Sequence, residues 1–356
     1  MQQLPFLYRF CLSHKFTGNQ SPQNMKKPQS FFRSLSSRIP ARLSASSAAV
    51  DPLAVRSQFD ELITAELIKL IPQTPSDHSE CTTSSTWLIH ALSASATTQK
   101  IALQSLANVA LQDSDRKVLN EFLNDNVKLL DGCNEMAERI EMIRQYLDSL
   151  RIASHLLERN VSCLNRAEQA LNSCEEMERK CRDKHLSLIK VLNQKLKQDT
   201  TQILTSTSEL KEILSGSESV ALMACGILGI SLSLKSRHQQ LLGVKSRQPM
   251  SAARSGWSGA LHELQRRLKE EAEKKRKSGS SVTLTELQMT VAAARKLRDQ
   301  VRCGNRSDET KGAAKELTRR CGDLEEDIRD LEKGVKELYK NLISVRMCLL
   351  GILSQA

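Results

Sequence analysis

The chain has 356 residues and a formal net charge of +11, and only 3% of its residues are aromatic. A β-sandwich or an α/β enzyme places many more aromatic side chains in its strands and pockets, so both classes are disfavoured. The length suffices for a buried core in one large or two ordinary domains. No proline occurs between Pro75 and Pro249 or after Pro249, and long proline-free segments favour helices. We therefore expect an all-α fold, an elongated multi-helix bundle.

The positive charge is concentrated in two segments. Residues 1–50 carry seven Lys and Arg and no Asp or Glu, and residues 235–277 carry twelve Lys and Arg against four Glu. The rest of the chain is therefore mildly acidic. A high isoelectric point that arises in this way does not by itself indicate nucleic-acid binding.

Residues 1–50 are also rich in Ser. Basic and Ser-rich composition without acidic residues is typical of an organellar transit peptide, here with a preference for the plastid. We expect a disordered leader that is removed on import into the chloroplast. The alternative is a leader that is never cleaved, with initiation at Met25, in a protein of the cytosol or the endomembranes.

Residues 51–234 are expected to form the N-terminal half of the bundle. The first helix starts after Pro52 and ends at Pro72, and the second is capped by the segment Ser84-Ser85-Thr86. Apolar residues recur at helical spacing in both. They are Phe59, Leu62, Ile63, Leu67 and Leu70 in the first helix, and Trp87, Leu88, Ala91, Leu92, Ile101, Leu103 and Leu106 in the second.

The third predicted helix starts at residues 113–115 and contains the most distinctive segment of the chain, Leu123–Asn134. Leu123, Val127 and Leu130 are predicted to share one buried face. Further on, positions at alternating steps of four and three indicate helix packing; they are Ile143, Leu147, Leu150, Ser154, Leu157, Val161, Leu164, Glu168 and Leu171. We expect a break near Asn160. One or two charged helices then follow to Leu214, with core-facing candidates Leu171, Met177, Cys181, Leu188, Leu192 and Leu196.

Residues 219–234 carry no charge and form a short apolar helix. Sixteen residues are fewer than the roughly 20 that span a bilayer. The small residues Ala224, Gly226 and Gly229 suit close helix packing in lipid or in the centre of a soluble bundle. We favour a buried or membrane-touching helix and keep a true span as the alternative.

Residues 235–284 are expected to comprise a basic loop to residue 260, a charged helix and a linker, and residues 285–356 to complete the bundle. The second helix of this C-terminal part has the most regular pattern of the chain. Its apolar positions at 4-3 spacing are Leu317, Cys321, Leu324, Ile328, Leu331, Val335, Leu338, Leu342, Val345 and Leu349. We predict a coiled-coil-like helix packed inside the bundle. A homodimeric coiled coil, and hence a homo-oligomer, is the alternative.

The sequence contains no nucleotide-binding, zinc-protease or serine-hydrolase motif. Cys174, Cys181 and His185 share one helix face and are the nearest approach to a metal site, but no fourth ligand accompanies them. His90 has no visible catalytic partner. The ten cysteines form no C-x-x-C pair, which favours reduced thiols in an intracellular protein. We therefore expect no catalytic, cofactor-binding or metal-binding residue, and no enzyme.

The basic tract 262–277 ends in Lys274, Lys275, Arg276 and Lys277. Its lack of interleaved aromatic residues argues against nucleic-acid binding. A solvated helix face, partly paired with Glu, is the simplest interpretation. The functional interpretation is contact with an anionic membrane surface through these four residues, beside a protein partner bound through helix faces.

Several motifs occur in a fixed order along the chain. They are Phe59-Asp60-Glu61-Leu62 through Leu70-Ile71-Pro72, Ser85-Thr86-Trp87-Leu88, Asn126-Val127-Lys128-Leu129-Leu130-Asp131-Gly132-Cys133-Asn134 and Leu150-Arg151-Ile152-Ala153. In these motifs the chain resembles the plant BYPASS family over about residues 55–350. The resemblance implies a plant protein with a helical body and no catalytic residue. It also implies a role in root and shoot development, in which family members restrain a root-derived mobile signal, thought to be carotenoid-derived, that arrests shoot growth.

Two classes of function follow from these expectations. The first is a non-enzymatic regulator or scaffold that works through helix faces, with an adaptor in membrane trafficking or exocytosis as one form of it. The second is a modulator of isoprenoid metabolism that holds an apolar ligand between its helices. We favour the first class because the sequence contains no catalytic constellation.

Overall fold

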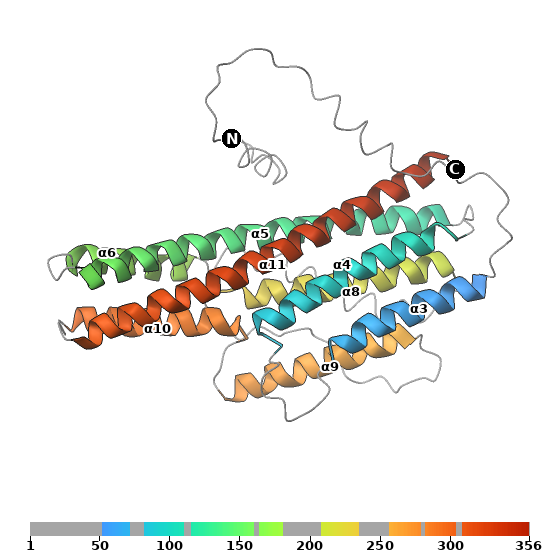
Figure 1. Ribbon diagram of the computed structural model, residues 1–356. Helices are drawn as coiled ribbons and strands as arrows, with labels where there is room; N and C mark the ends of the chain where they lie inside the picture. The colour runs from blue at the N-terminus through green and yellow to red at the C-terminus, as the bar shows by residue number, and fades with distance from the viewer. Residues whose placement is uncertain are drawn as a thin grey trace, which may run out of the picture. The chain divides into compact units, whose positions relative to one another are not determined.

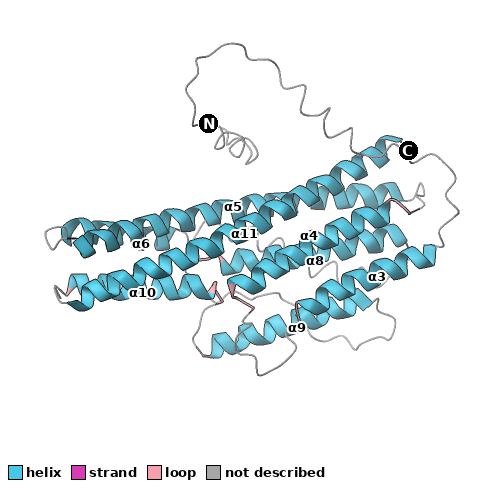
Figure 2. Ribbon diagram, viewed as in Figure 1, coloured by secondary structure: helices cyan, strands magenta, loops and turns pink. Residues whose placement is uncertain are grey.

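The computed structural model describes residues 52–71, 82–109, 115–159, 164–180, 208–234, 256–278, 282–303 and 308–355. The described residues form eight α-helices and no strand (Figure 2). The helices are α3 (Pro52–Lys69), α4 (Ser85–Leu106), α5 (Asp115–Arg159), α6 (Leu164–Lys180), α8 (Glu209–Ser231), α9 (Gly256–Lys277), α10 (Thr285–Arg302) and α11 (Asp308–Gln355). The all-α prediction is confirmed. The expectations for residues 1–50 and for Cys181, Leu188, Leu192 and Leu196 lie outside the described residues.

The two longest helices, α5 and α11, pack along each other and run the length of the bundle (Figure 1). They are antiparallel, because Asn126 near the start of α5 donates to the carbonyl oxygen of Leu342 (3.3 Å) near the end of α11. Towards the end of α5, Arg151 pairs with Glu325 of α11. This pair of helices spans both halves of the bundle.

Each half is completed by two shorter helices. Helix α4 packs on the last part of α11, α8 packs on the first part of α5, and the two pack on each other; we call this the α4/α8 half. Helices α6 and α10 cover the rest and form the α6/α10 half. There, Glu178 of α6 accepts hydrogen bonds from the Tyr146 hydroxyl of α5 (3.1 Å) and from Arg295 of α10 (2.6 Å). One buried carboxylate thus connects three helices.

Helices α3 and α9 form an outer pair that packs on α4 and α8 (Figure 1). The Asp60 carboxylate of α3 accepts from the backbone N–H groups of Gly256 (2.9 Å) and Trp257 (2.7 Å), and so caps α9 from a neighbouring helix. Gly216 of α8 allows the close approach, because a Cβ there would lie 3.1 Å from the Phe59 ring. The expected loop to residue 260 is therefore too long, since a cap from another helix starts α9 at Gly256.

The ten predicted positions of α11 at 4-3 spacing are all 2% exposed or less. They pack against α5, α4 and α10 of the same chain. The prediction of a core-facing stripe is confirmed. The stripe is buried within the chain, as the predicted packing inside the bundle requires.

The predicted buried face of α5 is partly wrong. Leu123 and Leu130 are buried, but Val127 is 40% exposed, and the fully buried residues between them are Asn126 and Leu129. The buried residues of α5 keep 4-3 spacing, but one of these positions is the polar Asn126, which the apolar pattern leaves out. In α3, Leu62 was likewise predicted to face the core and is 42% exposed. Both residues lie on the edge of an apolar stripe that is narrower than predicted.

Helix α8 has the length and apolar composition of a membrane-spanning helix, and 94% of its apolar window is buried inside the bundle. It extends from Glu209 to Ser231, so it is longer than the expected segment 219–234. The buried Arg139 of α5 donates to the Gly229 carbonyl and pairs with Glu135 (2.6 Å), which places a cation at the C-terminal end of α8. A central position in the bundle accounts for the composition of this helix.

Candidate interaction surface at the end of helix α9

The N-terminal ends of α4 and α10 meet. The backbone N–H of Thr285 donates to the Thr83 carbonyl (3.0 Å), and that of Ser85 donates to Glu286 Oε1 (3.2 Å). Ser84 of the predicted capping segment caps α4, since its hydroxyl accepts from the N–H of Trp87 (3.3 Å). Because the first N–H groups of a helix lack intrahelical acceptors and carry partial positive charge, carboxylates and hydroxyls stabilise these ends.

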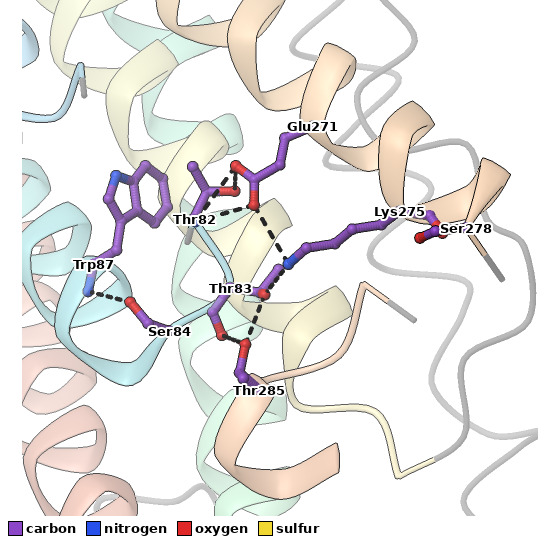
Figure 3. A network of polar contacts seen from close by, with 8 residues as sticks. All are labelled: Thr82, Thr83, Ser84, Trp87, Glu271, Lys275, Ser278 and Thr285. Atoms are coloured by element: carbon purple, nitrogen blue, oxygen red, sulfur yellow. Dashed lines mark hydrogen bonds and ion pairs between the residues drawn. The ribbon is translucent and has the colours of Figure 1, made fainter. Parts of the chain in front are cut away.

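Helix α9 contributes two side chains to the same place (Figure 3). Glu271 accepts from the backbone N–H of Thr82 (3.2 Å) and from its hydroxyl (2.5 Å). Lys275 donates to the Thr83 hydroxyl and pairs with Glu271 (3.3 Å). We call Thr82–Ser85, Glu271, Lys275, Thr285 and Glu286 the junction. Helix α8 reaches it as well, because the N–H of Leu284 donates to the Ser231 carbonyl (2.8 Å).

Asp327 of α11 lies beside the junction. Its burial raises its pKa above the ordinary value, a hydrogen bond with Ser85 opposes this, and the charge of Glu286 adds to the rise. Two carboxylates therefore share the N-terminal end of α4. The partial positive charge of the two helix ends stabilises this concentration of negative charge.

The junction divides the predicted basic cluster. Lys275 is turned inward, with its side chain 19% exposed. Lys274, Arg276 and Lys277 are exposed, and the side chains of these three residues make no hydrogen bond or ion pair with any residue that the structure describes. We call these three residues the basic end of α9. Sequence alone assigned all four residues to one surface, because consecutive charges give no sign of which one meets a buried partner.

In the middle of α9, the arginines are paired with glutamates. Arg266 pairs with Glu263 (2.7 Å) and Glu270 (2.5 Å), and Arg267 pairs with Glu263 (2.7 Å). Hydrogen bonds from the two arginines lower the pKa of Glu263 to about 2. The predicted Glu-paired helix face therefore exists in the middle of α9, and the unpaired charge is confined to its end.

A second group of polar side chains is buried in the α4/α8 half. Gln99 donates to the Ser217 carbonyl (2.8 Å), and Asn341 donates to the Ala96 carbonyl (3.2 Å). Asn126 donates to α11, as described above. The carboxamide oxygens of Gln99 and Asn126 are buried and accept no hydrogen bond. Sequence reasoning missed these residues, although Asn126 could have been found as a polar position within the 4-3 stripe.

The candidate chemistry of the sequence is not assembled in the described part of the chain. Cys174 is buried, and burial raises the pKa of its thiol to about 12, so the thiol is neutral. Cys181 and His185 lie outside the described residues, and His90 is exposed on α4. Among the described residues, no three His, Cys, Asp or Glu side chains could jointly hold a metal ion.

One pair of thiols does meet inside the bundle. Cys133 of α5, in the distinctive segment, hydrogen-bonds Cys225 of α8, and both are free and buried. This contact and burial raise the pKa of Cys133 well above its ordinary value. A buried neutral thiol is a poor nucleophile and metal ligand, so the pair acts as part of the core.

The described helices thus define an all-α bundle whose buried polar groups connect helices to one another. A family model described as Protein BPS1 matches residues 95–352, from within α4 to within α11. The chain belongs to this family, and it is a BYPASS-like protein as the motif resemblance implied. The comparisons with curated proteins and with solved structures gave no match.

Proposed function

We propose that the protein is a non-enzymatic plant developmental regulator that is required for normal root and shoot growth. In this proposal it restrains production of a root-derived mobile signal, carotenoid-derived, that arrests shoot development. The observation that carries the proposal is the family match over residues 95–352, which includes every described helix except α3, the start of α4 and the last residues of α11.

The polar groups of the described helices support a role without catalysis. Glu178, Glu271 and Arg139 each connect two or more helices, and the buried thiols of Cys133 and Cys174 have raised pKa values. Such groups stabilise a scaffold and are poorly suited to proton transfer or nucleophilic attack. The protein then works through contacts made by its exposed helix faces.

The site of action can be tested in plants that lack the protein. The chain is restored either in roots alone or in shoots alone, and shoot growth is measured. Restoration in roots alone is expected to recover the shoot, because the signal is produced in the root and travels. Rescue by expression in shoots alone would contradict the proposal and favour a local adaptor in membrane trafficking or exocytosis.

The chemical class of the signal is tested separately. Carotenoid synthesis is blocked by an inhibitor in roots that lack the protein, and the shoot is expected to resume growth. A shoot that stays arrested, while carotenoids are depleted in the roots, would remove the carotenoid-derived origin. The role in restraining a mobile signal would still be judged by the root and shoot expression experiment.

We also propose that the protein acts in the plastid. The support is the composition of residues 1–50, with seven Lys and Arg, many Ser and no acidic residue. Sequencing the N-terminus of the protein purified from plant tissue tests this. A mature N-terminus near residue 50 is expected, whereas an intact Met1 or Met25 would move the proposed location to the cytosol or endomembranes.

A further inference from the structure

The basic end of α9 is a group of unpaired charges on the outer pair of helices. Lys274, Arg276 and Lys277 lie within the last turn of α9 and are exposed. Lysine and arginine at a helix C-terminus also interact favourably with the helix dipole, which accounts for some basic residues here. The helix dipole alone does not require three cations without partners, and it does not account for the exposed apolar residue of α10 described next.

An exposed apolar side chain lies one helical turn beyond the junction on α10. Thr285, in the first turn of α10, contacts Thr83 (3.1 Å), whose hydroxyl accepts the hydrogen bond of Lys275. Met289 follows Thr285 by one helical turn, so the two residues share a face of α10. Met289 is 47% exposed. Ala292 and Lys296 continue this face, are exposed, and extend the apolar and basic character.

The junction fixes the position of the basic end. Lys275 and Glu271 hold the last turns of α9 to Thr82 and Thr83, and Thr285 holds the start of α10 to the same segment. The three cations and Met289 are therefore presented from two helices whose ends are joined. Cations and an exposed apolar side chain on two joined helix ends favour contact with an anionic lipid surface.

The charges next to the basic end disfavour a nucleic acid. Moving back along α9, the next exposed charged residues include Glu273 and Glu270. A nucleic-acid backbone follows an extended row of cations and would meet these carboxylates, and no aromatic side chain is interleaved for base stacking. Phospholipid head groups are separate anions, and each cation near an anionic surface strengthens binding about fivefold, so the attraction does not require an extended row of cations.

We infer that the basic end of α9, together with Met289 of α10, attaches the bundle to the head groups of anionic phospholipids at a membrane surface. Lys275 has a positioning role, because it holds α9 in place and does not face the lipid. This attachment goes beyond the proposed function, which requires no membrane.

The test is binding of the full chain to vesicles of phosphatidylcholine, with and without phosphatidylglycerol, measured by co-sedimentation. The chain is expected to bind the anionic vesicles and to lose affinity as salt is raised. The variant Lys274→Gln/Arg276→Gln/Lys277→Gln is expected to bind them about 100-fold more weakly, from about fivefold per cation near a charged surface. Met289→Gln is expected to weaken binding less, and without salt dependence of the loss.

Two matched variants control for net charge. Lys311→Gln/Lys315→Gln/Lys340→Gln removes three exposed cations of α11, and Arg33→Gln/Arg38→Gln/Arg42→Gln removes three from residues 1–50. The α11 variant is expected to bind like the wild type. The inference would be overturned if the α11 variant lost as much affinity for the anionic vesicles as the α9 variant. It would also be overturned if the α9 variant kept its affinity while the residue 1–50 variant failed to bind. Absence of wild-type binding to the anionic vesicles would overturn it as well.

Discussion

Asn126 is a fully buried polar residue in the stripe of α5 that faces α11. It donates one hydrogen bond across the helix pair, and its carboxamide oxygen has no donor. A polar residue in an apolar stripe favours one register of two packed helices, at some cost in stability. Its position in the most distinctive motif of the family therefore has a structural explanation.

Replacing Asn126 with Asp tests how dry this position is. The carboxylate would be buried, so desolvation in the folded state should raise its pKa well above the unfolded value of about 4. Arg346 of α11, which donates to the Leu123 carbonyl one turn earlier (2.6 Å), is the described cation that opposes this rise. We expect a loss of about 2–4 kcal/mol in the free energy of unfolding at neutral pH. The loss should shrink as the pH falls towards the unfolded pKa, because both states then hold the proton.

Denaturant unfolding over a pH series measures this effect. Asn124→Asp is the control, because Asn124 is exposed on the same helix, and its effect should stay within about 0.5 kcal/mol. An Asn126→Asp variant that is as stable as this control at neutral pH would show that water or a cation reaches the site.

The cysteines should differ sharply in reactivity. Cys303 is exposed, whereas Cys133, Cys174, Cys225 and Cys321 are buried. Burial raises the pKa of Cys174 and of Cys321 to about 12. Alkylation at mildly basic pH, followed by peptide mass spectrometry, should label Cys303 in the native protein and the four buried residues only after unfolding. Labelling of Cys174 as fast as Cys303 would contradict the described packing of α6.

The same shift predicts a pH dependence of stability. The folded state favours the neutral thiol of Cys174, since its pKa of about 12 lies above the ordinary value. This contribution is complete below an unfolded pKa of about 8.5 and is lost as the pH rises towards about 12. As the pH rises between these two values, the free energy of unfolding of Cys174→Ala should therefore fall less than that of the wild type.

Of the described glycines, the one with the closest neighbouring helix is Gly334 of α11, which faces α4. A Cβ on Gly334 would lie 2.9 Å from Leu92 Cδ1 and 3.2 Å from Leu92 Cβ, whereas a Cβ on Gly322 of the same helix would meet nothing within 4 Å. Ala is favoured over Gly in a helix by about 0.5–1 kcal/mol. The two glycines therefore separate helix propensity from packing.

We expect Gly322→Ala to stabilise the protein by about 0.5–1 kcal/mol. Gly334→Ala should lose that gain and destabilise by up to about 1 kcal/mol, because α4 must shift away from α11. Thermal or denaturant unfolding of the two variants measures the difference. Equal stabilisation by both substitutions would mean that Leu92 moves aside freely and that the helices are not in close contact there.

The regular elements of this fold could be predicted from sequence, and their contacts could not. The 4-3 stripe of α11, the cap at Ser84 and the start of α10 at Thr285 follow from local patterns. Val127 and Leu62 were misplaced because the width of a buried face depends on the neighbouring helices. The inward position of Lys275 depends on Thr83 and Glu271, which only the fold brings together.

At the scale of the whole bundle, α5 and α11 belong to both halves. The chain has two tryptophans, Trp87 in α4 and Trp257 in α9. Neither lies on α6 or α10, although Trp87 is two residues from Ser85, which contacts Glu286 at the start of α10. Their fluorescence therefore reports mainly on the α4/α8 half and on the outer pair of helices. Damage to the other half should reach them if the shared helices make the described bundle unfold as one unit.

Leu297→Ala tests this cooperativity. Leu297 of α10 is fully buried in the α6/α10 half, and its truncation should cost about 2–5 kcal/mol. We expect the fluorescence midpoint in denaturant to fall together with the midpoint from circular dichroism. An unchanged fluorescence midpoint, with a second step in circular dichroism, would show that the two halves unfold separately.

The pairing of α5 with α11 has a consequence for the order of events during synthesis. Residues 115–159 leave the ribosome long before residues 308–355, and α11 contributes the surface on which the buried stripe of α5 packs. The growing chain therefore carries an uncovered apolar helix until its last described helix emerges. Exposed apolar surface of this kind favours chaperone binding and aggregation until α11 completes the core.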